Sequence, residues 1–246
     1  MTIQVVFTPA GLAKDEVAGR GVFVIDVLRA TTTMCAALHH GARSIIPVAS
    51  IEEAIRMGQT LGPDDLLLTG ERHGKPIPGF ALGNSPLEMT EAQVRGKTLV
   101  MTTTNGTGAL LSAAGAAHVY VAAAANLSAA AARARQLMAD GLDLVVVCAG
   151  RHGAFGLDDA YTAGRLVVET IGDRRRLDDL DDAAVAAVDL VRRYGVRWER
   201  PLGRSAAARQ LDAIGMADDV VEAAKQDRYP VLPVFAERRV QVAPLG

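Results

Sequence analysis

Short runs of β-branched and other apolar residues recur along the sequence, and each is followed by a segment with helical periodicity. The clearest run is Gly21–Asp26, which precedes a helix expected over Thr31–His40, and Gly41 would end that helix as a C-cap. Strand–helix alternation is typical of a parallel sheet covered by helices. We therefore expect an α/β fold of three layers, a mostly parallel sheet with helices on both faces.

The same pattern predicts the elements of the remaining chain. Strands are expected at Ser44–Val48, Leu66–Thr69, Thr98–Met101, His118–Val121 and Leu142–Cys148, with a late strand at Tyr229–Phe235. Helices are expected at Ser50–Leu61, which opens with a capping box, and at Gly106–Ala116, Ser128–Asp140, Leu157–Ile171, Asp181–Tyr194 and Ser205–Ile214. A charge run over residues 173–182 is expected to be a solvated turn or helix end. No Pro-, Gly- or Ser-rich linker divides the sequence, so we treat residues 1–246 as a single unit, with room for two sub-lobes that meet at the active site.

The composition argues against several classes of protein. A formal net charge of −2 does not suit a general nucleic-acid binder, so an anion site would depend on a few arginines. The most apolar stretch, Ala113–Ala132, is too rich in alanine for a membrane span, and Met1–Thr8 lacks the features of a signal peptide. We expect a cytoplasmic protein in which Cys35 and Cys148 are buried thiols. A homodimer is expected only because it is the commonest assembly.

Reactive side chains follow four of the expected strands. They are Asp26, Arg29 and Thr31–Thr33 after the first of these strands, Glu71, Arg72, Asn84 and Ser85 after the next, Thr102–Gly108 after the third, and Arg151, Asp158 and Asp159 after the last. Ligands of open α/β sheets bind beyond the carboxyl ends of the strands. The convergence of arginines, hydroxyls and carboxylates at these ends predicts one site for a small anionic ligand.

Each part of this pattern also has a structural interpretation. Asp26 could cap the helix that follows its strand, and Asp158 and Asp159 stand where acids are favoured at a helix start. The Thr102–Gly108 segment could be an ordinary turn, or a cradle for an anion at a helix N-terminus.

Several familiar phosphate chemistries do not fit the sequence. No Walker A loop is present, and Leu28 stands where a haloacid-dehalogenase-type phosphatase has its second Asp. Cys148 and Arg151 are too close in sequence for a cysteine phosphatase. The triplet Arg-His-Gly occurs twice, starting at Arg72 and at Arg151, but neither copy follows the first strand as in a histidine phosphatase.

Longer segments resemble the signature blocks of the 2-phosphosulfolactate phosphatase (ComB-like) family. These segments are Val24–Thr33, Gly70–Arg72, Gly79–Pro86, Thr102–Thr107 and Cys148–Gly150, in the order of the family. The resemblance implies a magnesium-dependent phosphatase that hydrolyses 2-phospho-3-sulfolactate, a step toward coenzyme M in the archetypal members. The family usually has Phe-Ser-Leu-Glu-Asp where this chain has Phe155–Asp159, so Asp159 matches directly and Asp158 is one methylene shorter.

We hypothesise the following roles on this basis. Asp26, Glu71 and Asp159 would hold Mg²⁺, an ion that prefers oxygen ligands, and Arg29 and Arg72 would bind anionic oxygens next to them. The substrate-binding set would comprise Thr103, Thr104, Asn105 and Gly106 as a cradle, with Thr32, Asn84, Ser85 and Arg151. Two other functions remain open: a phosphatase of the same fold acting on another small phosphorylated hydroxy acid, and a non-catalytic binder of an anionic metabolite.

Overall fold

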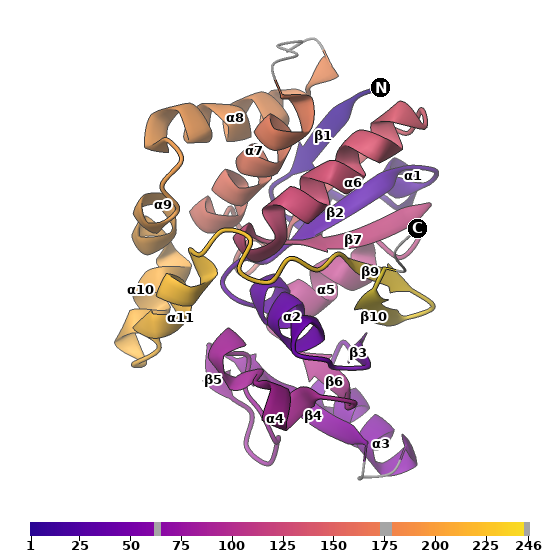
Figure 1. Ribbon diagram of the computed structural model, residues 1–246, viewed down its shortest axis with the longest axis vertical. Helices are drawn as coiled ribbons and strands as arrows, with labels where there is room; N and C mark the ends of the chain where they lie inside the picture. The colour runs from indigo at the N-terminus through magenta and orange to yellow at the C-terminus, as the bar shows by residue number, and fades with distance from the viewer. Residues whose placement is uncertain (62–64, 173–178, 244–246) are drawn as a thin grey trace.

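The computed structural model describes residues 1–61, 65–172 and 179–243 (Figure 1). Within these ranges, ten strands form one sheet in the order β1-β8-β2-β7-β9-β10-β3-β6-β4-β5. Their bounds are β1 Ile3–Val6, β2 Gly21–Ile25, β3 Ser44–Pro47, β4 Leu66–Arg72, β5 Lys75–Pro76, β6 Thr98–Thr102, β7 His118–Ala122, β8 Leu144–Cys148, β9 Pro233–Ala236 and β10 Arg239–Val242. The expected α/β fold with a mostly parallel sheet is confirmed.

Helices fill most of the connections between the strands. They are α1 Lys14–Val17, α2 Ala30–His39, α3 Ile51–Leu61, α4 Glu91–Val94, α5 Gly106–Ser112, α6 Leu127–Ala139, α7 Leu157–Ile171, α8 Asp182–Tyr194, α9 Glu199–Arg204, α10 Ala206–Ala213 and α11 Ala217–Ala223. Short 3₁₀ turns occur at η1 Pro9–Gly11, η2 Pro86–Glu88 and η3 Ala124–Asn126. Gly41 follows α2 with φ +90°, as expected for a C-cap, and Ser50 Oγ accepts the Glu53 N–H before α3 at 3.1 Å.

The sheet consists of two groups of parallel strands joined by an antiparallel hairpin. Strands β1, β8, β2 and β7 form one parallel group, and β3, β6 and β4 form the other. The pairs β7–β9, β9–β10 and β10–β3 are all antiparallel, so the two groups run in opposite senses across the hairpin. The hairpin meets β7 through Tyr120 and Val234 and meets β3 through Val240 and Ile45. Because these junctions are narrow and sheets twist, the carboxyl ends of β2 and β4 can face a common space.

Both faces of the sheet are covered by helices. On the first group, α6 and α7 pack against β2 and β8, while α2 and α5 pack against β7 and β2, so all five residues of β2 are buried. On the second group, α3 packs against β4 and β6. Figure 1 shows the last three helices, α9 to α11, gathered at one side of the sheet, near α2. The described parts of the chain contain no helix with the length and apolar character needed to cross a membrane.

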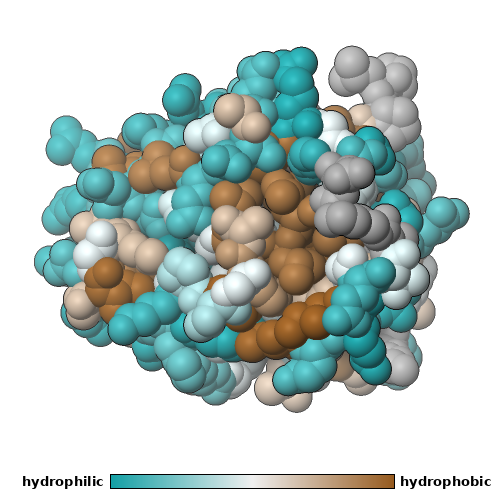
Figure 2. Space-filling model, turned by 90° about the horizontal axis from the view of Figure 1, so that it is seen from below, coloured by the Kyte–Doolittle hydropathy of each residue, from teal (hydrophilic) through white to brown (hydrophobic). Residues whose placement is uncertain are grey.

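A main hydrophobic cluster fills the first group and extends to β3 and β6, and a smaller one lies beneath α3. The smaller cluster consists of the buried residues Ile46, Val48, Ala54, Leu66 and Val100. Met57, Leu68 and Phe80 pack against it while staying partly exposed. In Figure 1, α3 and β4 lie at the bottom of the molecule. Figure 2 views the molecule from below and shows hydrophobic surface in the middle of that face. Both cysteines, Cys35 and Cys148, are buried free thiols, as expected.

The observed elements differ from the expected ones mainly near the C-terminus. The strand expected from Tyr229 is wrong at its start, because the Tyr229 N–H bonds to Ala125 O and regular pairing begins only at Pro233. Helix α5 ends at Ser112, before the expected Ala116. Strands β1, β5 and β10 and helices α1, α4, α9 and α11 were not among the expected elements. The charge run expected over 173–182 lies mostly outside the described residues.

Candidate active site

One cleft gathers residues from the carboxyl ends of both groups of strands. It contains about 590 Å³ of empty space, including the part open to solvent. Its walls come from the segments after β2, β4, β6 and β8, together with α10. The lining residues are Asp26, Leu28, Arg29, Glu71, His73, Gly74, Asn84, Thr104, Asn105, Gly150, Arg151, His152, Asp158, Asp159, Ala207, Gln210 and Leu211. The predicted convergence of strand ends is therefore present, whereas the contribution of α10 was not foreseen.

Asp26 follows β2 directly and is 7% exposed. The first residue of α5, Gly106, lies against it so closely that a Cβ at this glycine would stand 2.5 Å from Asp26 Oδ2 and 2.6 Å from Ala30 Cβ. Glycine is required here because any side chain would push the carboxylate or the start of α2 out of place. Gly106 thus has a packing role beside Asp26, and its role in a phosphate cradle stays a prediction.

Glu71 is held by the backbone on both sides of the cleft. Its Oε1 accepts the Thr104 N–H at 2.6 Å, and its Oε2 accepts the Gly74 N–H at 2.7 Å and the Thr104 hydroxyl at 3.1 Å. These donors fix the carboxylate at the wall of the cleft. They also occupy Thr104, which sequence reasoning assigned to the substrate.

Asp158 and Asp159 open α7, and they differ in their surroundings. Asp159 Oδ1 accepts the Val27 N–H at 2.8 Å and Oδ2 accepts the Gly150 N–H at 3.0 Å. Asp159 therefore ties the segments after β2 and β8 to the start of α7. Asp158 also lines the cleft, at 5% exposure. Asp159 matches the family pattern, but its carboxylate is hydrogen-bonded to two other segments of the chain. Asp158 is held less firmly by other segments, so its carboxylate is the better placed of the two to bind a ligand.

Negative charge is concentrated in this cleft. Burial, with the nearby Glu71 and Asp158 carboxylates, raises the pKa of Asp26 to about 7. Burial also raises the pKa of Asp158 to about 6, against the opposing effect of the Arg151 guanidinium. The pKa of Asp159 is raised well above its ordinary value by burial and by the charges of Asp158 and Asp26. The carboxylates thus repel one another in the protein alone.

Arg29 is bound to a carboxylate that sequence reasoning did not identify. Its Nη1 donates to Asp219 Oδ2 at 2.5 Å and its Nη2 donates to Gly74 O at 2.6 Å. Asp219 belongs to α11 and also accepts the Ser85 hydroxyl at 2.5 Å. Arg29 lines the cleft, but its charge is balanced by Asp219. No local pattern marks Asp219, since an acid in the first turn of a helix is ordinary.

Other predicted site residues lie outside the cleft. Arg72 does not line it: its Nη2 donates to Thr102 Oγ1 at 2.9 Å and its Nη1 to Glu71 O at 2.7 Å. Successive side chains of a strand point to opposite faces, so Glu71 and Arg72 diverge. The Thr32 hydroxyl donates to Val27 O at 2.8 Å, and Thr103 Oγ1 accepts the Thr107 N–H at 3.0 Å. Thr32, Thr103 and Ser85 are thus occupied within the protein.

Arg151, Asn84 and Asn105 do reach the cleft. Arg151 Nη2 donates to Gln210 Oε1 at 2.5 Å, an uncharged partner, so its positive charge stays available to a ligand. Asn105 Oδ1 accepts the His152 N–H at 3.1 Å. Asn84 is 4% exposed, and its Oδ1 is buried with no hydrogen-bond partner among the residues that the structure describes. A buried acceptor without a donor points to a group that the protein itself does not supply.

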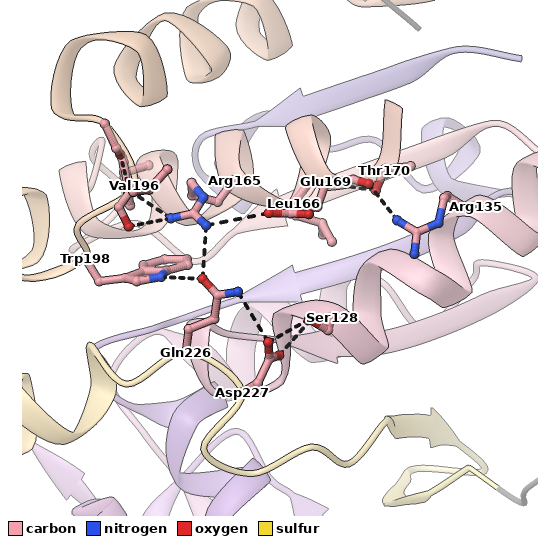
Figure 3. Close-up of polar contacts among 12 residues, drawn as sticks. Ser128, Arg135, Arg165, Leu166, Glu169, Thr170, Val196, Trp198, Gln226 and Asp227 are labelled. Atoms are coloured by element: carbon pink, nitrogen blue, oxygen red, sulfur yellow. Dashed lines mark hydrogen bonds and ion pairs between the residues drawn. The ribbon is translucent and has the colours of Figure 1, made fainter. Parts of the chain in front are cut away.

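A polar network behind the cleft holds α7 to the C-terminal helices (Figure 3). The Arg165 guanidinium stacks over Trp198, 4.6 Å from the ring centre, and donates to Gln226 Oε1 at 3.0 Å and Val196 O at 2.9 Å. Trp198 donates to the same Gln226 oxygen at 3.0 Å. Because α7 begins with the two aspartates and α10 and α11 carry Gln210 and Asp219, this network fixes opposite walls of the cleft relative to each other.

The donor set fits a magnesium ion with few protein ligands. Among the residues that the structure describes, no three His, Cys, Asp or Glu side chains form a ready cluster for a metal. Mg²⁺ does not need one, since it is usually bound by one or two carboxylates together with waters and substrate phosphate. Asp26 and Asp158 meet this requirement, because burial raises the pKa of both carboxyls and a bound cation would balance their buried negative charges. The buried Asn84 Oδ1 is a further acceptor for a bound water.

Comparisons with known proteins place the chain in one family. A family model described as "2-phosphosulpholactate phosphatase" matches residues 6–238. A protein of Symbiobacterium thermophilum named "Probable 2-phosphosulfolactate phosphatase" is 42% identical over 92% of this chain and 95% of its own length. Proteins with the same name from Thermus thermophilus and Caldanaerobacter subterraneus are 40% and 35% identical over 88% and 95% of this chain, and over the same shares of their own lengths. The chain belongs to the 2-phosphosulfolactate phosphatase family.

Proposed function

We propose that the chain is a magnesium-dependent phosphatase that hydrolyses 2-phospho-3-sulfolactate to 3-sulfolactate and phosphate. The name of the family and of its relatives supports the reaction class, that of phosphoric monoester hydrolases. The observation that carries the magnesium requirement is the crowding of Asp26, Asp158 and Glu71 around a cleft that must admit a multiply charged anion.

The charges of the cleft explain why a cation is needed. Phosphate approaching Asp26 and Asp158 would be repelled, and Arg29 offers little compensation because Asp219 neutralises it. Asp26 and Asp158 would hold Mg²⁺, and the ion would supply positive charge to polarise the phosphoryl group and stabilise the departing alkoxide. A pure anion binder would gain nothing from buried, mutually repelling carboxylates, so the same observation favours the enzyme over a binding protein.

The residues of the chain then have distinct roles. Asp26 and Asp158 would hold the cation, and Glu71 would keep Thr104 and the turn at Gly74 in position through its three hydrogen bonds. Arg151 would bind an anionic oxygen of the substrate, because arginine presents a fork of N–H donors to such groups. Asn84 would accept from a bound water or a substrate hydroxyl.

Two routes of attack are compatible with these roles. In one, the Asp26 carboxylate attacks phosphorus and displaces the 3-sulfolactate alkoxide, which takes up a proton, and water then hydrolyses the acyl phosphate on Asp26 to phosphate. In the other, Asp26 takes the proton from a water that attacks phosphorus directly and expels the same alkoxide, which is then protonated. Mass spectrometry of enzyme quenched in acid during turnover separates them, since only the first leaves phosphate on Asp26.

The decisive experiment is phosphate release from racemic 2-phosphosulfolactate by the purified protein, with Mg²⁺ and then with EDTA. Turnover that is abolished by EDTA and restored by excess Mg²⁺ is the expected result. A parallel panel of 2-phospholactate and phosphoglycolate tests the substrate. Turnover of the panel without turnover of 2-phosphosulfolactate would overturn the substrate assignment, and no release from any compound by folded protein would overturn the activity.

A further inference from the structure

The two copies of Arg-His-Gly, which lie far apart in the sequence, form matching turns at the mouth of the cleft. Arg72 pairs with Lys75 across one turn, and Arg151 pairs with Ala154 across the other. The two central residues of each turn have positive φ, 54° and 83° for His73 and Gly74, and 51° and 75° for His152 and Gly153. Positive φ at both central positions defines the type I′ turn of two-residue hairpins.

Histidine is an unusual choice for the first position of such a turn. Asn, Asp and Gly are the residues preferred there in hairpins, although histidine also adopts positive φ more readily than most side chains do. The chain nevertheless places histidine at this position in both turns. The side chains of both histidines line the cleft, and their ring centres lie 6.3 Å apart. The use of histidine in both turns, in place of the preferred Asn, Asp or Gly, indicates a role for the side chains beside this cleft beyond making the turns.

Both turns are anchored by amide side chains. Gln210 of α10 donates from Nε2 to His73 O at 2.8 Å, while its Oε1 accepts from Arg151 at 2.5 Å, so one side chain bridges the two turns. Asn105 Oδ1 accepts the His152 N–H at 3.1 Å. These contacts use backbone atoms of the histidines. The imidazoles have no hydrogen bond to a neighbouring residue among those described here, which leaves their N–H groups to a ligand.

The arginines near the cleft offer few N–H donors to an anionic ligand, because many of their N–H groups are bound within the protein. Arg29 is neutralised by Asp219, and Arg72 is turned toward Thr102 outside the cleft. Arg151 is thus the cleft arginine with an uncharged side-chain partner. A three-carbon substrate that carries phosphate, carboxylate and sulfonate needs donors for the groups that neither the cation nor Arg151 contacts.

We propose that His73 and His152 form an imidazole clamp that binds the sulfonate of the substrate and so selects it among phosphorylated acids. This inference rests on the proposed function, since it concerns the substrate of the same site. The clamp lies at the mouth, whereas Asp26 and Asp158 are deeply buried. The clamp would therefore hold the end of the substrate farthest from phosphorus and leave the chemical step to the buried groups.

The test uses His73→Asn, His152→Asn and the double variant, with His118→Asn as the matched control. Asparagine before glycine is strongly favoured in a type I′ turn, so these changes keep the backbone while removing the rings. His118 is an exposed histidine at the start of β7 and does not line the cleft. Thermal unfolding of each variant verifies that the fold is retained.

Kinetics with two substrates measure selection. We expect each single variant to raise KM for 2-phosphosulfolactate about tenfold, the loss typical of a hydrogen bond to a charged group, with little change in kcat. The KM for 2-phospholactate, which lacks the sulfonate, should not change. Equal effects on both substrates, or none on either, would overturn the clamp.

Calorimetric binding of 3-sulfolactate and lactate separates this inference from the proposed function. A protein without phosphatase activity whose binding of 3-sulfolactate still depends on both histidines would refute the function and support the clamp. An active enzyme in which the double variant binds 3-sulfolactate as tightly as the unaltered protein does would refute the clamp alone.

Discussion

Arg29 and Asp219 form a buried ion pair across 190 positions of the sequence, with Nη1 and Oδ2 2.5 Å apart. Their side chains are only 2% and 4% exposed. Asp219 also accepts the hydroxyl of Ser85, so one carboxylate joins the start of α2, the segment before η2 and the helix α11. The pair thus attaches the C-terminal helices to the strand ends that form the cleft.

Asp219→Ala should lower the free energy of unfolding by about 3–5 kcal/mol, because it leaves the charge of Arg29 buried without a partner. Urea unfolding at fixed Mg²⁺ measures the difference. Asp218→Ala is the matched control, since Asp218 stands in the same first turn of α11 but is exposed. A similar small effect of both changes would show that the pair contributes nothing to stability.

Asp26→Asn should reduce turnover by about 10²–10⁴-fold, the usual contribution of a general acid or base, and by more if Asp26 is the nucleophile. The same change should raise the free energy of unfolding of the metal-free protein. Asparagine carries no charge, so it avoids both the burial of a charged carboxylate and the repulsion from Glu71 and Asp158, which together raise the pKa of Asp26. Phosphate release and urea unfolding on one preparation test both effects. A variant that is both active and less stable would contradict the assignment.

The metal-free protein should lose stability as the pH rises from about 4 to about 7. The folded pKa of Asp26 is about 7 and that of Asp158 about 6, both above the ordinary value of 3.8. In this pH range the folded state therefore holds protons that the unfolded state has released. Each group then lowers the free energy of unfolding by up to about 1.4 kcal/mol per pH unit. Below pH 4 both states are protonated and the effect of these groups levels off.

Saturating Mg²⁺ should flatten this pH dependence, because a cation favours the ionised carboxylates. Unfolding midpoints measured between pH 4 and 8, with EDTA and with Mg²⁺, make the comparison. The Asp26→Asn variant should show a shallower slope than the unaltered protein in EDTA. Identical slopes with and without Mg²⁺ would place the cation elsewhere.

The framework of the fold followed from local patterns. The β-branched run at Gly21–Asp26 and the glycine at position 41 predicted β2 and the end of α2, because strand propensity and a left-handed cap are local properties. The strand ends that carry Asp26, Glu71 and Arg151 were predicted to converge, and they do. The opposite senses of the two strand groups could not be foreseen, since the short hairpin that reverses them gives little signal in sequence.

The site was less predictable wherever a side chain acts through distant partners. Asp219 and Gln210 lie on C-terminal helices whose docking depends on contacts such as that of Arg165 with Trp198. The sequence does predict that the side chains of Glu71 and Arg72 point in opposite directions, because successive residues of a strand face opposite sides of the sheet. The assignment of both to one anion site overlooked that alternation.

Gly106→Ala should impair the enzyme through packing alone, and Gly108→Ala offers the control within the same helix. At Gly106 a new Cβ would stand 2.5 Å from Asp26 Oδ2 and 2.6 Å from Ala30 Cβ, whereas at Gly108 nothing lies within 4 Å. We expect Gly106→Ala to cost about 1–3 kcal/mol of stability, as overpacking does, and Gly108→Ala to gain up to about 1 kcal/mol from helix propensity.

The kinetic consequences of the two changes should also diverge. Displacing a carboxylate at the reacting centre by about 1 Å can cost about 10²-fold in rate, so Gly106→Ala should lower kcat while Gly108→Ala leaves it unchanged. Phosphate release at saturating Mg²⁺ measures both. Because neither glycine offers a side chain to a ligand, a loss confined to Gly106→Ala would trace activity to the position of Asp26 itself. Equal activity in the two variants would mean that the Asp26 carboxylate can shift without harm, which a group at the reacting centre cannot do.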